Sequence, residues 1–129
     1  APRGLADIAE LADQASVPLV DVEVGAGLGE MHPSVGAALF RIAQESVTNA
    51  RRHADGAAHV RIRVSADGDA VVLSVVDDGA PVGPGRTPGF GIVGMSERVA
   101  LLGGTLVAGP GIERGWAVEA RVPRSGVKR

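Results

Sequence analysis

Four polar residues that could handle a phosphorylated ligand lie within the stretch from Arg41 to Ala54. Glu45, Asn49 and His53 follow one another at steps of four, and Arg52 comes one turn after Asn49. At about 100° per residue, Glu45, Asn49 and Arg52 fall within roughly 60° of arc on a helix. An Asn oxygen can ligate Mg²⁺, an Arg can pair with phosphate, and a Glu can accept a proton. Such a rim suits a nucleotide, although a plain solvated helix face would show the same spacing.

The helix that carries this rim must also bury its adjacent side. Apolar residues recur there at three- and four-residue spacing, which predicts a single apolar stripe: Val35, Leu39, Ile42, Ala43, Val47 and Ala50. Pro33 is suited to the first turn of a helix. We therefore predict a central helix that is half core and half functional surface.

Composition bounds the class of protein. The 129 residues fit one domain, 1–129, with a core built from aliphatic side chains, because only 2% of the residues are aromatic. A net charge of −2 gives no reason to expect nucleic acid or direct membrane contact. The lack of cysteine excludes disulfides and thiolate chemistry and fits a cytoplasmic location. No apolar run reaches the roughly 20 residues of a membrane span.

The remaining segments read mostly as strands that alternate apolar and charged residues, so one face of the sheet should be wet. We expect strands at 19–24, 59–65, 71–77, 105–108 and 116–122, and shorter helices at 4–15 and about 92–102. The fold class predicted is α/β, a two-layer sandwich of a mixed sheet with helices on one face. The charged residues expected to form cross-strand pairs on the wet face are Asp21, Glu23, Arg61, Arg63, Glu119 and Arg121.

Asp77 ends a strand on the side occupied by apolar residues, so its carboxylate should point toward the helical layer. A buried acid without a partner is costly. Asp77 could accept a hydrogen bond from a ligand, such as an adenine amino group. It could equally do no more than start the turn Asp77-Asp78-Gly79.

Two glycine clusters could approach an anion. Residues 25–29 lie between a strand and a helix and are best interpreted as an ordinary turn. Residues 89–94 match G-x-G-x-x-G and open a helix, but no strand precedes them, so the dinucleotide-binding motif fails on context. Glycines at a helix N-terminus still allow an anion to approach backbone N–H groups. The Gly- and Pro-rich segment 79–91 suits a mobile lid.

Three of these stretches together resemble the motifs of sensor histidine kinases. Residues 45–54, which read ESVTNARRHA and follow Gln44, look like the N box. Asp77-Asp78-Gly79 looks like the first glycine box. Residues 89–99, GFGIVGMSERV, look like the second glycine box. The combination is most similar to the nitrate-sensor-like class of bacterial histidine kinases. It implies the Bergerat ATP-binding fold of the GHKL superfamily.

The resemblance implies a role for each residue of these motifs. Asn49 would ligate Mg²⁺ and Glu45 would be the catalytic acid/base residue. Asp77 would hold adenine, with Gly79 beside it. The remaining residues would serve the phosphates and the lid: Arg52 and His53 approaching the phosphates, and Gly89, Gly91 and Gly94 as lid hinge and phosphate cradle.

The chain departs from the family pattern at two positions. Pro81 stands where the first glycine box usually has its second glycine. The last strand opens with Gly115-Trp116 where the family usually has Gly-Thr, whose Thr helps to hold adenine. We interpret Trp116 as a core residue rather than a pocket wall, since apolar packing is the commoner use of Trp.

The resemblance predicts an ATP·Mg²⁺-binding catalytic domain that transfers the γ-phosphoryl group to a histidine on a separate dimerisation domain, and so serves a response regulator indirectly. The segment before the first strand is too short for the helical hairpin that carries the acceptor histidine, so we expect a fragment that is not self-sufficient. One alternative is an anti-sigma-type serine kinase on the same fold. Another is a degenerate, non-catalytic interaction module.

Overall fold

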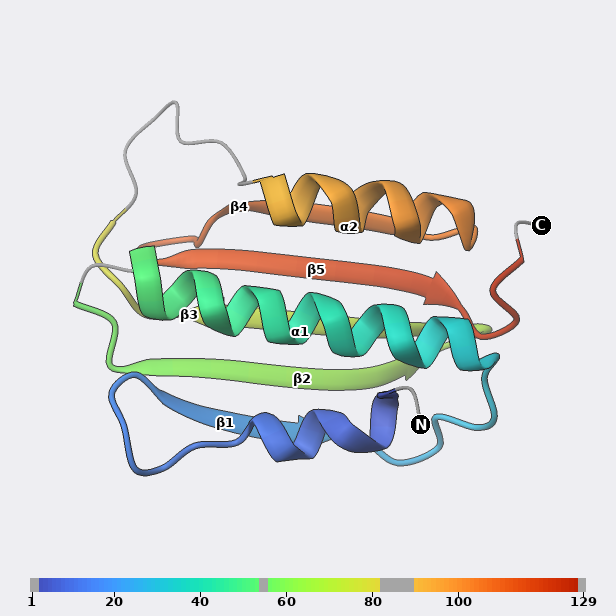
Figure 1. Cartoon of the computed structure of the whole chain (residues 1–129), viewed down its shortest axis with the longest axis horizontal. Helices are drawn as coiled ribbons and strands as arrows, with labels where there is room; N and C mark the ends of the chain where they lie inside the picture. The colour runs from blue at the N-terminus through green and yellow to red at the C-terminus, as the bar shows by residue number, and fades with distance from the viewer. Residues whose placement is uncertain (1–2, 54–55, 82–89, 128–129) are drawn as a thin grey trace.

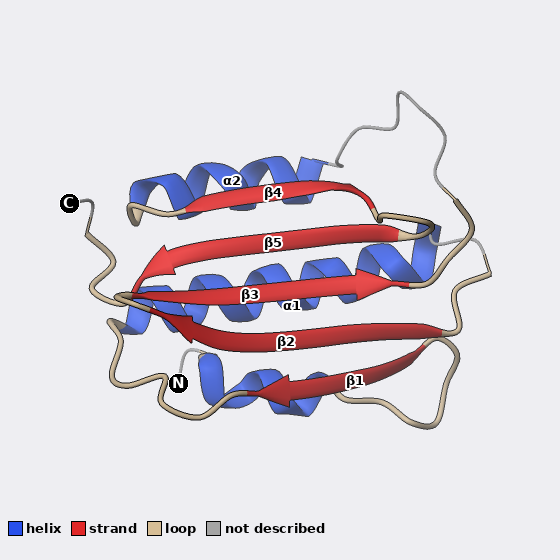
Figure 2. Cartoon of the chain, turned by 180° about the vertical axis from the view of Figure 1, so that it is seen from behind, coloured by secondary structure: helices blue, strands red, loops and turns tan. Residues whose placement is uncertain are grey.

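The computed structural model describes residues 3–53, 56–81 and 90–127, with backbone only for residues 90–92. A five-stranded sheet forms one layer and the helices form the other (Figure 1). The elements follow in this order: η1 (Leu5–Leu11), β1 (Leu19–Val24), α1 (Pro33–His53), β2 (His59–Asp67), β3 (Ala70–Asp77), α2 (Phe90–Leu101), β4 (Thr105–Pro110) and β5 (Trp116–Pro123). Seen from behind, the sheet lies in front of every helix (Figure 2). The predicted two-layer α/β sandwich is confirmed.

The strand order in the sheet is β1-β2-β3-β5-β4. β1 pairs with β2 in parallel, and all the other neighbouring strands are antiparallel. The sheet is therefore mixed, as the sequence predicts. Its single parallel pair is joined through α1, because two parallel neighbours need a long crossover connection. The last strand in sequence, β5, lies between β3 and β4.

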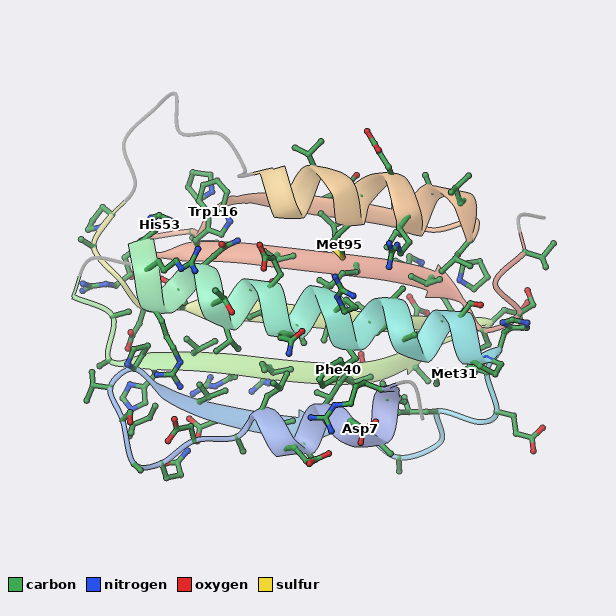
Figure 3. The ribbon with its side chains drawn as sticks, viewed as in Figure 1. Asp7, Met31, Phe40, His53, Met95 and Trp116 are labelled. Atoms are coloured by element: carbon green, nitrogen blue, oxygen red, sulfur yellow. The ribbon has the colours of Figure 1, made fainter. Side chains whose placement is uncertain are left out.

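The core lies between α1 and the face of the sheet that it covers. It is aliphatic, as the shortage of aromatic residues requires, and each fully buried Val or Leu side chain contributes about 1.5–3 kcal/mol. The fully buried residues include Leu39 and Ile42 from α1 and alternate residues from the strands: Val60, Ile62, Val64, Val71, Leu73, Ala120 and Val122. Phe40 is the largest of the buried side chains and lies between α1 and η1 (Figure 3).

The uncovered face carries the charged residues of the strands, but only part of the expected pairing occurs. Asp21 lies opposite Arg61, and Glu23 lies opposite Arg63 with their charged atoms 3.7 Å apart. Glu119 has only uncharged neighbours on β3 and β4, so its expected pairing is wrong, whereas Arg121 forms a cross-strand ion pair with Asp67 of β2. Alternation fixes the face of a residue, whereas its cross-strand neighbour depends on register. These exposed pairs contribute little, about 0–1 kcal/mol each.

The predicted boundaries hold within a few residues except for the first helix. That element, expected at 4–15, is a 3₁₀-helix that ends at Leu11. Asp13 then pairs with Val20 of β1 through two backbone hydrogen bonds of 2.7 and 3.0 Å, which diverts the chain from the helix into the sheet. Near its start, the Gly4 amide donates to the Asp7 carboxylate over 2.7 Å.

Candidate functional site

One end of the molecule brings together termini of several elements. The last turn of α1, the end of β3, the start of α2 and the start of β5 all lie on the left in Figure 1. Residues far apart in the sequence, from the regions of Asn49, Asp77 and Trp116, therefore share one end of the fold. The glycine loop 25–29 leads instead to the start of α1 at the opposite end, where the Gly25 amide donates to the Val64 carbonyl over 2.8 Å.

The polar rim residues of α1 become more exposed toward this end of the helix. Glu45 and Asn49 are half-buried, and Arg52 and His53 are exposed. Arg51 turns away, since its guanidinium lies 2.9 Å from the Asp13 carboxylate before β1. Across the described parts of the chain, neither Arg52 nor His53 has an ion-pair partner. These two side chains are thus the ones left to meet an anion beyond the end of the helix.

Asp77 points toward the helical layer, as the alternation of β3 predicts, and only 8% of its surface is exposed. Its Oδ1 accepts a hydrogen bond from the Gly79 amide over 2.9 Å, so Asp77 also starts the turn that the sequence allowed. Oδ2 receives no hydrogen bond from any residue that the structure describes. Oδ2 is not among the buried atoms that lack a partner, so it keeps some exposed surface and is open to accept a hydrogen bond from a ligand N–H.

The hairpin between β4 and β5 closes over the segment that follows Asp77. The Arg114 Nε donates to the Gly79 carbonyl over 3.0 Å, and the Gly115 amide donates to the Ala80 carbonyl over 3.4 Å. Gly115 has φ +73°, and a Cβ atom there would overlap the carbonyl oxygen of Asp77. The sequence drew attention to Gly115 but not to Arg114, whose contact joins residues 35 apart in the chain.

Asp78, which the sequence reading did not single out, ties the end of β3 to the start of β2. Its Oδ1 accepts hydrogen bonds from the amides of Ala58 and His59, over 2.7 and 2.9 Å. Its Oδ2 lies 3.1 Å from Nδ1 of His59, and because a carboxylate can only accept, Nδ1 must carry the proton. Partial burial raises the pKa of Asp78. The hydrogen bonds from the backbone amides of His59 and Ala58 and from the His59 ring lower it by more, so this pKa lies below its ordinary value.

Trp116 is half-buried and packs against the core, as interpreted from the sequence. It also lies at the same end of the molecule as His53 (Figure 3). The two interpretations, core residue and residue near the pocket, are therefore compatible.

Ser46 presents a further unmatched polar atom on α1. The residue is 6% exposed, and its Oγ has no hydrogen-bond partner in the described structure. A buried hydroxyl without a partner is rare in folded proteins and calls for a bound water or ligand. It follows Glu45 directly, on the buried side of the helix.

The second glycine cluster is described only in part. Gly89, with the rest of 82–89, lies outside the described residues, so its predicted place in a lid is not tested. Gly91 falls in the first turn of α2, which begins at Phe90 rather than near Ile92. N–H groups in a first turn have no partner within the helix, which is the property that anion binding requires. A Cβ at Gly94 would meet nothing within 4 Å.

A cation at this end could not be held by protein alone. In the part of the chain that the structure describes, no group of three or more His, Cys, Asp or Glu residues is placed to hold a metal ion. The Asn49 amide could offer one of the six oxygens that Mg²⁺ requires. The residues present therefore fit a cation that arrives with phosphate oxygens and water.

The comparisons with known proteins decide the family. Residues 34–126 match the model of the histidine kinase-, DNA gyrase B- and HSP90-like ATPases. The chain belongs to this ATPase family. It is 38% identical over 100 residues to the sensor histidine kinase YxjM of Bacillus subtilis, and 35% identical over 98 residues to the kinase/phosphatase DegS of the same species. The matches cover 76% and 72% of this chain but only about a quarter of those relatives, 24% and 25%.

A solved structure shares the fold of this chain. The kinase domain of the blue-light activated histidine kinase of Erythrobacter litoralis superposes with a TM-score of 0.67, at 22% identity, over 93% of this chain and 57% of that one. Membership of the ATPase family implies ATP binding. The converging ends of α1, β3, α2 and β5 carry the described members of the predicted site, whereas Gly89 lies outside the described residues. None of the helices that the structure describes is long and apolar enough to cross a membrane.

Proposed function

We propose that this chain is the catalytic, ATP·Mg²⁺-binding domain of a two-component sensor histidine kinase. The observation that carries the proposal is the nearly buried Asp77 carboxylate, with its unmatched Oδ2, at the same end of the fold as the α1 rim. The relatives named above support it, because they are sensor histidine kinases. Since the proposed substrate is ATP, we place the domain in the cytoplasm.

Adenine recognition is assigned to Asp77. Its Oδ2 can accept a hydrogen bond from the exocyclic amino group of adenine, while Oδ1 stays engaged by Gly79. Guanine has a carbonyl oxygen at the equivalent position, and two acceptors would then oppose each other. A site built to pair with a substrate N–H strongly rejects an analogue that lacks it. Asp77 therefore favours adenine nucleotides over guanine nucleotides.

Phosphate contacts are assigned to the end of α1 and the start of α2. Arg52 and His53 are exposed at the end of α1 and have no ion-pair partner among the described residues. Gly91 and Gly94 belong to the first turns of α2, and Gly89 precedes them. Asn49 would supply one oxygen to Mg²⁺, which bridges the phosphates and neutralises their charge.

The proposed reaction transfers the γ-phosphoryl group of ATP to a histidine on a separate dimerisation domain of the parent protein. The imidazole nitrogen of that histidine forms the new P–N bond, and the bond to the β,γ-bridging oxygen breaks to release ADP. Glu45, one turn before Asn49, accepts the proton that the imidazole loses. A response regulator would then take the phosphoryl group from the histidine.

The test supplies the parent's dimerisation domain in trans with labelled ATP·Mg²⁺. We expect an acid-labile phosphoprotein, as phosphohistidine is, and essentially no acid-labile label when this chain is incubated alone. An acid-stable product would indicate the serine kinase alternative instead. Calorimetry with ATP·Mg²⁺ comes first, because a folded chain that binds no ATP would be the non-catalytic module and not a kinase domain.

A further inference from the structure

Asp78 lies directly after the proposed adenine-binding residue and has a different set of contacts. Its carboxylate helps to line a depression of about 420 Å³ that Asp77 also borders and that involves Arg61, Arg63 and Ser74 from the strands. Those strand residues belong to the wet face of the sheet, opposite the helical layer toward which Asp77 points. Both oxygens of the Asp78 carboxylate are engaged by Ala58 and His59, so Asp78 is not a free acceptor for a nucleotide that Asp77 holds.

The bonds of Asp78 extend the pairing of β3 with β2 beyond its last regular pair. That pair joins Val60 to Asp77. One residue further, the Asp78 carboxylate accepts hydrogen bonds from the amides of Ala58 and His59. The Asp78 amide in turn donates to the His59 carbonyl over 3.2 Å. The Ala58 carbonyl is itself bound by the Leu19 amide of β1 over 2.8 Å. The segment after β3 is thus anchored to two neighbouring strands.

The opposite side of the same segment is held by the β4–β5 hairpin. Arg114 binds the Gly79 carbonyl, and Gly115 packs against the backbone of Asp77 without room for a Cβ. The Asp77 backbone is consequently fixed from both sides. Without the Asp78 carboxylate, the β2 side would keep only its backbone pairing and would lose the two bonds to the amides of Ala58 and His59. The direction of the Asp77 carboxylate would then be less firmly fixed.

We propose that Asp78 is a positioning residue for adenine recognition, which acts by holding Asp77 in the direction required to meet the adenine amino group. This inference rests on the proposed role of Asp77. Asp78 contributes through hydrogen bonds that its carboxylate accepts from backbone amides, and these bonds are charge-assisted because the carboxylate is ionised. The ring of His59 adds a third contact, which lies next to Arg61 and Asp21 in the same depression.

The experiment measures ADP and GDP affinity by calorimetry for the wild type and for three variants whose folding is checked by circular dichroism. Asp78→Ala removes every side-chain bond to Ala58 and His59, and the ratio of ADP to GDP affinity should fall about tenfold. Asp78→Asn keeps a carbonyl acceptor for the two amides, so the ratio should fall only about threefold. This partial rescue separates positioning from a general loss of folded protein, which would weaken both nucleotides in parallel.

Asp67→Asn is the matched control. Asp67 lies at the other end of the same two strands, where it pairs with Arg121, so the change should leave the nucleotide ratio at the wild-type value. A folded Asp78→Ala protein with the wild-type ratio would overturn the proposal. Should Asp78→Ala fail to fold, an unchanged ratio in Asp78→Asn would overturn it instead. If wild-type protein bound neither nucleotide, the proposed function itself would be wrong, and this inference with it.

Discussion

Replacing Gly115 by Ala should damage the proposed adenine site through the backbone. Gly115 has φ +73°, a conformation that costs a residue with a Cβ atom roughly 1–2 kcal/mol. The added methyl group would also lie 2.9 Å from the carbonyl carbon of Asp77 and 3.0 Å from its Oδ1. These neighbours are backbone and a hydrogen-bonded carboxylate, so they can yield only by moving the residue that would meet adenine.

We expect Gly115→Ala to lower the free energy of unfolding by about 2–4 kcal/mol, the strained φ and the overlap together. ADP binding should weaken by at least tenfold in the protein that remains folded, because Asp77 must shift. Urea denaturation measures the first effect and calorimetry with ADP measures the second. The matched control is Gly109→Ala in β4, where a Cβ would meet nothing within 4 Å and both quantities should change little.

The reasoning would be refuted by a Gly115→Ala protein that unfolds at the wild-type urea concentration and binds ADP normally. A loss of stability with unchanged ADP affinity would retain the steric argument. It would remove the link between the hairpin and the proposed adenine site.

Three further predictions concern single carboxylates and the amide of the α1 rim. Asp77→Asn should weaken ATP and ADP binding by roughly 1–3 kcal/mol, the usual cost of spoiling a buried hydrogen bond, and an unchanged ADP affinity by calorimetry would count against the pocket. Glu45→Gln should bind ATP·Mg²⁺ nearly normally but transfer the phosphoryl group to the acceptor domain about 10²–10⁴-fold more slowly. A wild-type rate of phosphoryl transfer by this variant would end the acid/base assignment of Glu45. Asn49→Asp, in contrast, should lose Mg²⁺-dependent ATP binding. Because the pKa of Asp78 is lower in the folded protein, its carboxylate stabilises the fold above about pH 4 and ceases to do so as the pH falls through the folded pKa. The stability difference between wild type and Asp78→Asn in urea should therefore shrink between pH 7 and about pH 3, and a constant difference would contradict the contacts described for Asp78.

Local sequence patterns predicted the parts of this fold that depend on neighbours in the chain. The alternation of apolar and polar residues predicted the strands and the direction of Asp77 toward the helical layer. The 3.6-residue period of apolar residues predicted α1 and its polar rim. Both depend only on which side of an element a residue occupies. The expected charge pairing of Glu119 does not occur, and Arg121 pairs with Asp67, a residue that the pattern had not included, because register depends on which strand lies alongside.

The contacts that fix the end of β3 were beyond sequence reasoning for a related reason. Asp78 bonds to residues 19 and 20 positions away, and Arg114 bonds to Gly79 across 35 positions. Nothing in the residues around Asp78 distinguishes it from an ordinary turn aspartate. The roles of Glu45, Asn49, Arg52 and His53 stay predictions.

The position of β5 between β3 and β4 determines when, during synthesis, the domain could first form the proposed adenine site. The strand that closes the sheet is the last one to leave the ribosome, and until it inserts, β3 and β4 each present an unpaired edge open to wrong partners. Gly115 and Arg114 reach Asp77 and Gly79 only through this late insertion. A nascent chain that ends before Trp116 should therefore have α1 and its polar rim in place but no finished adenine site, and pairing of this kind between distant segments is intrinsically slow.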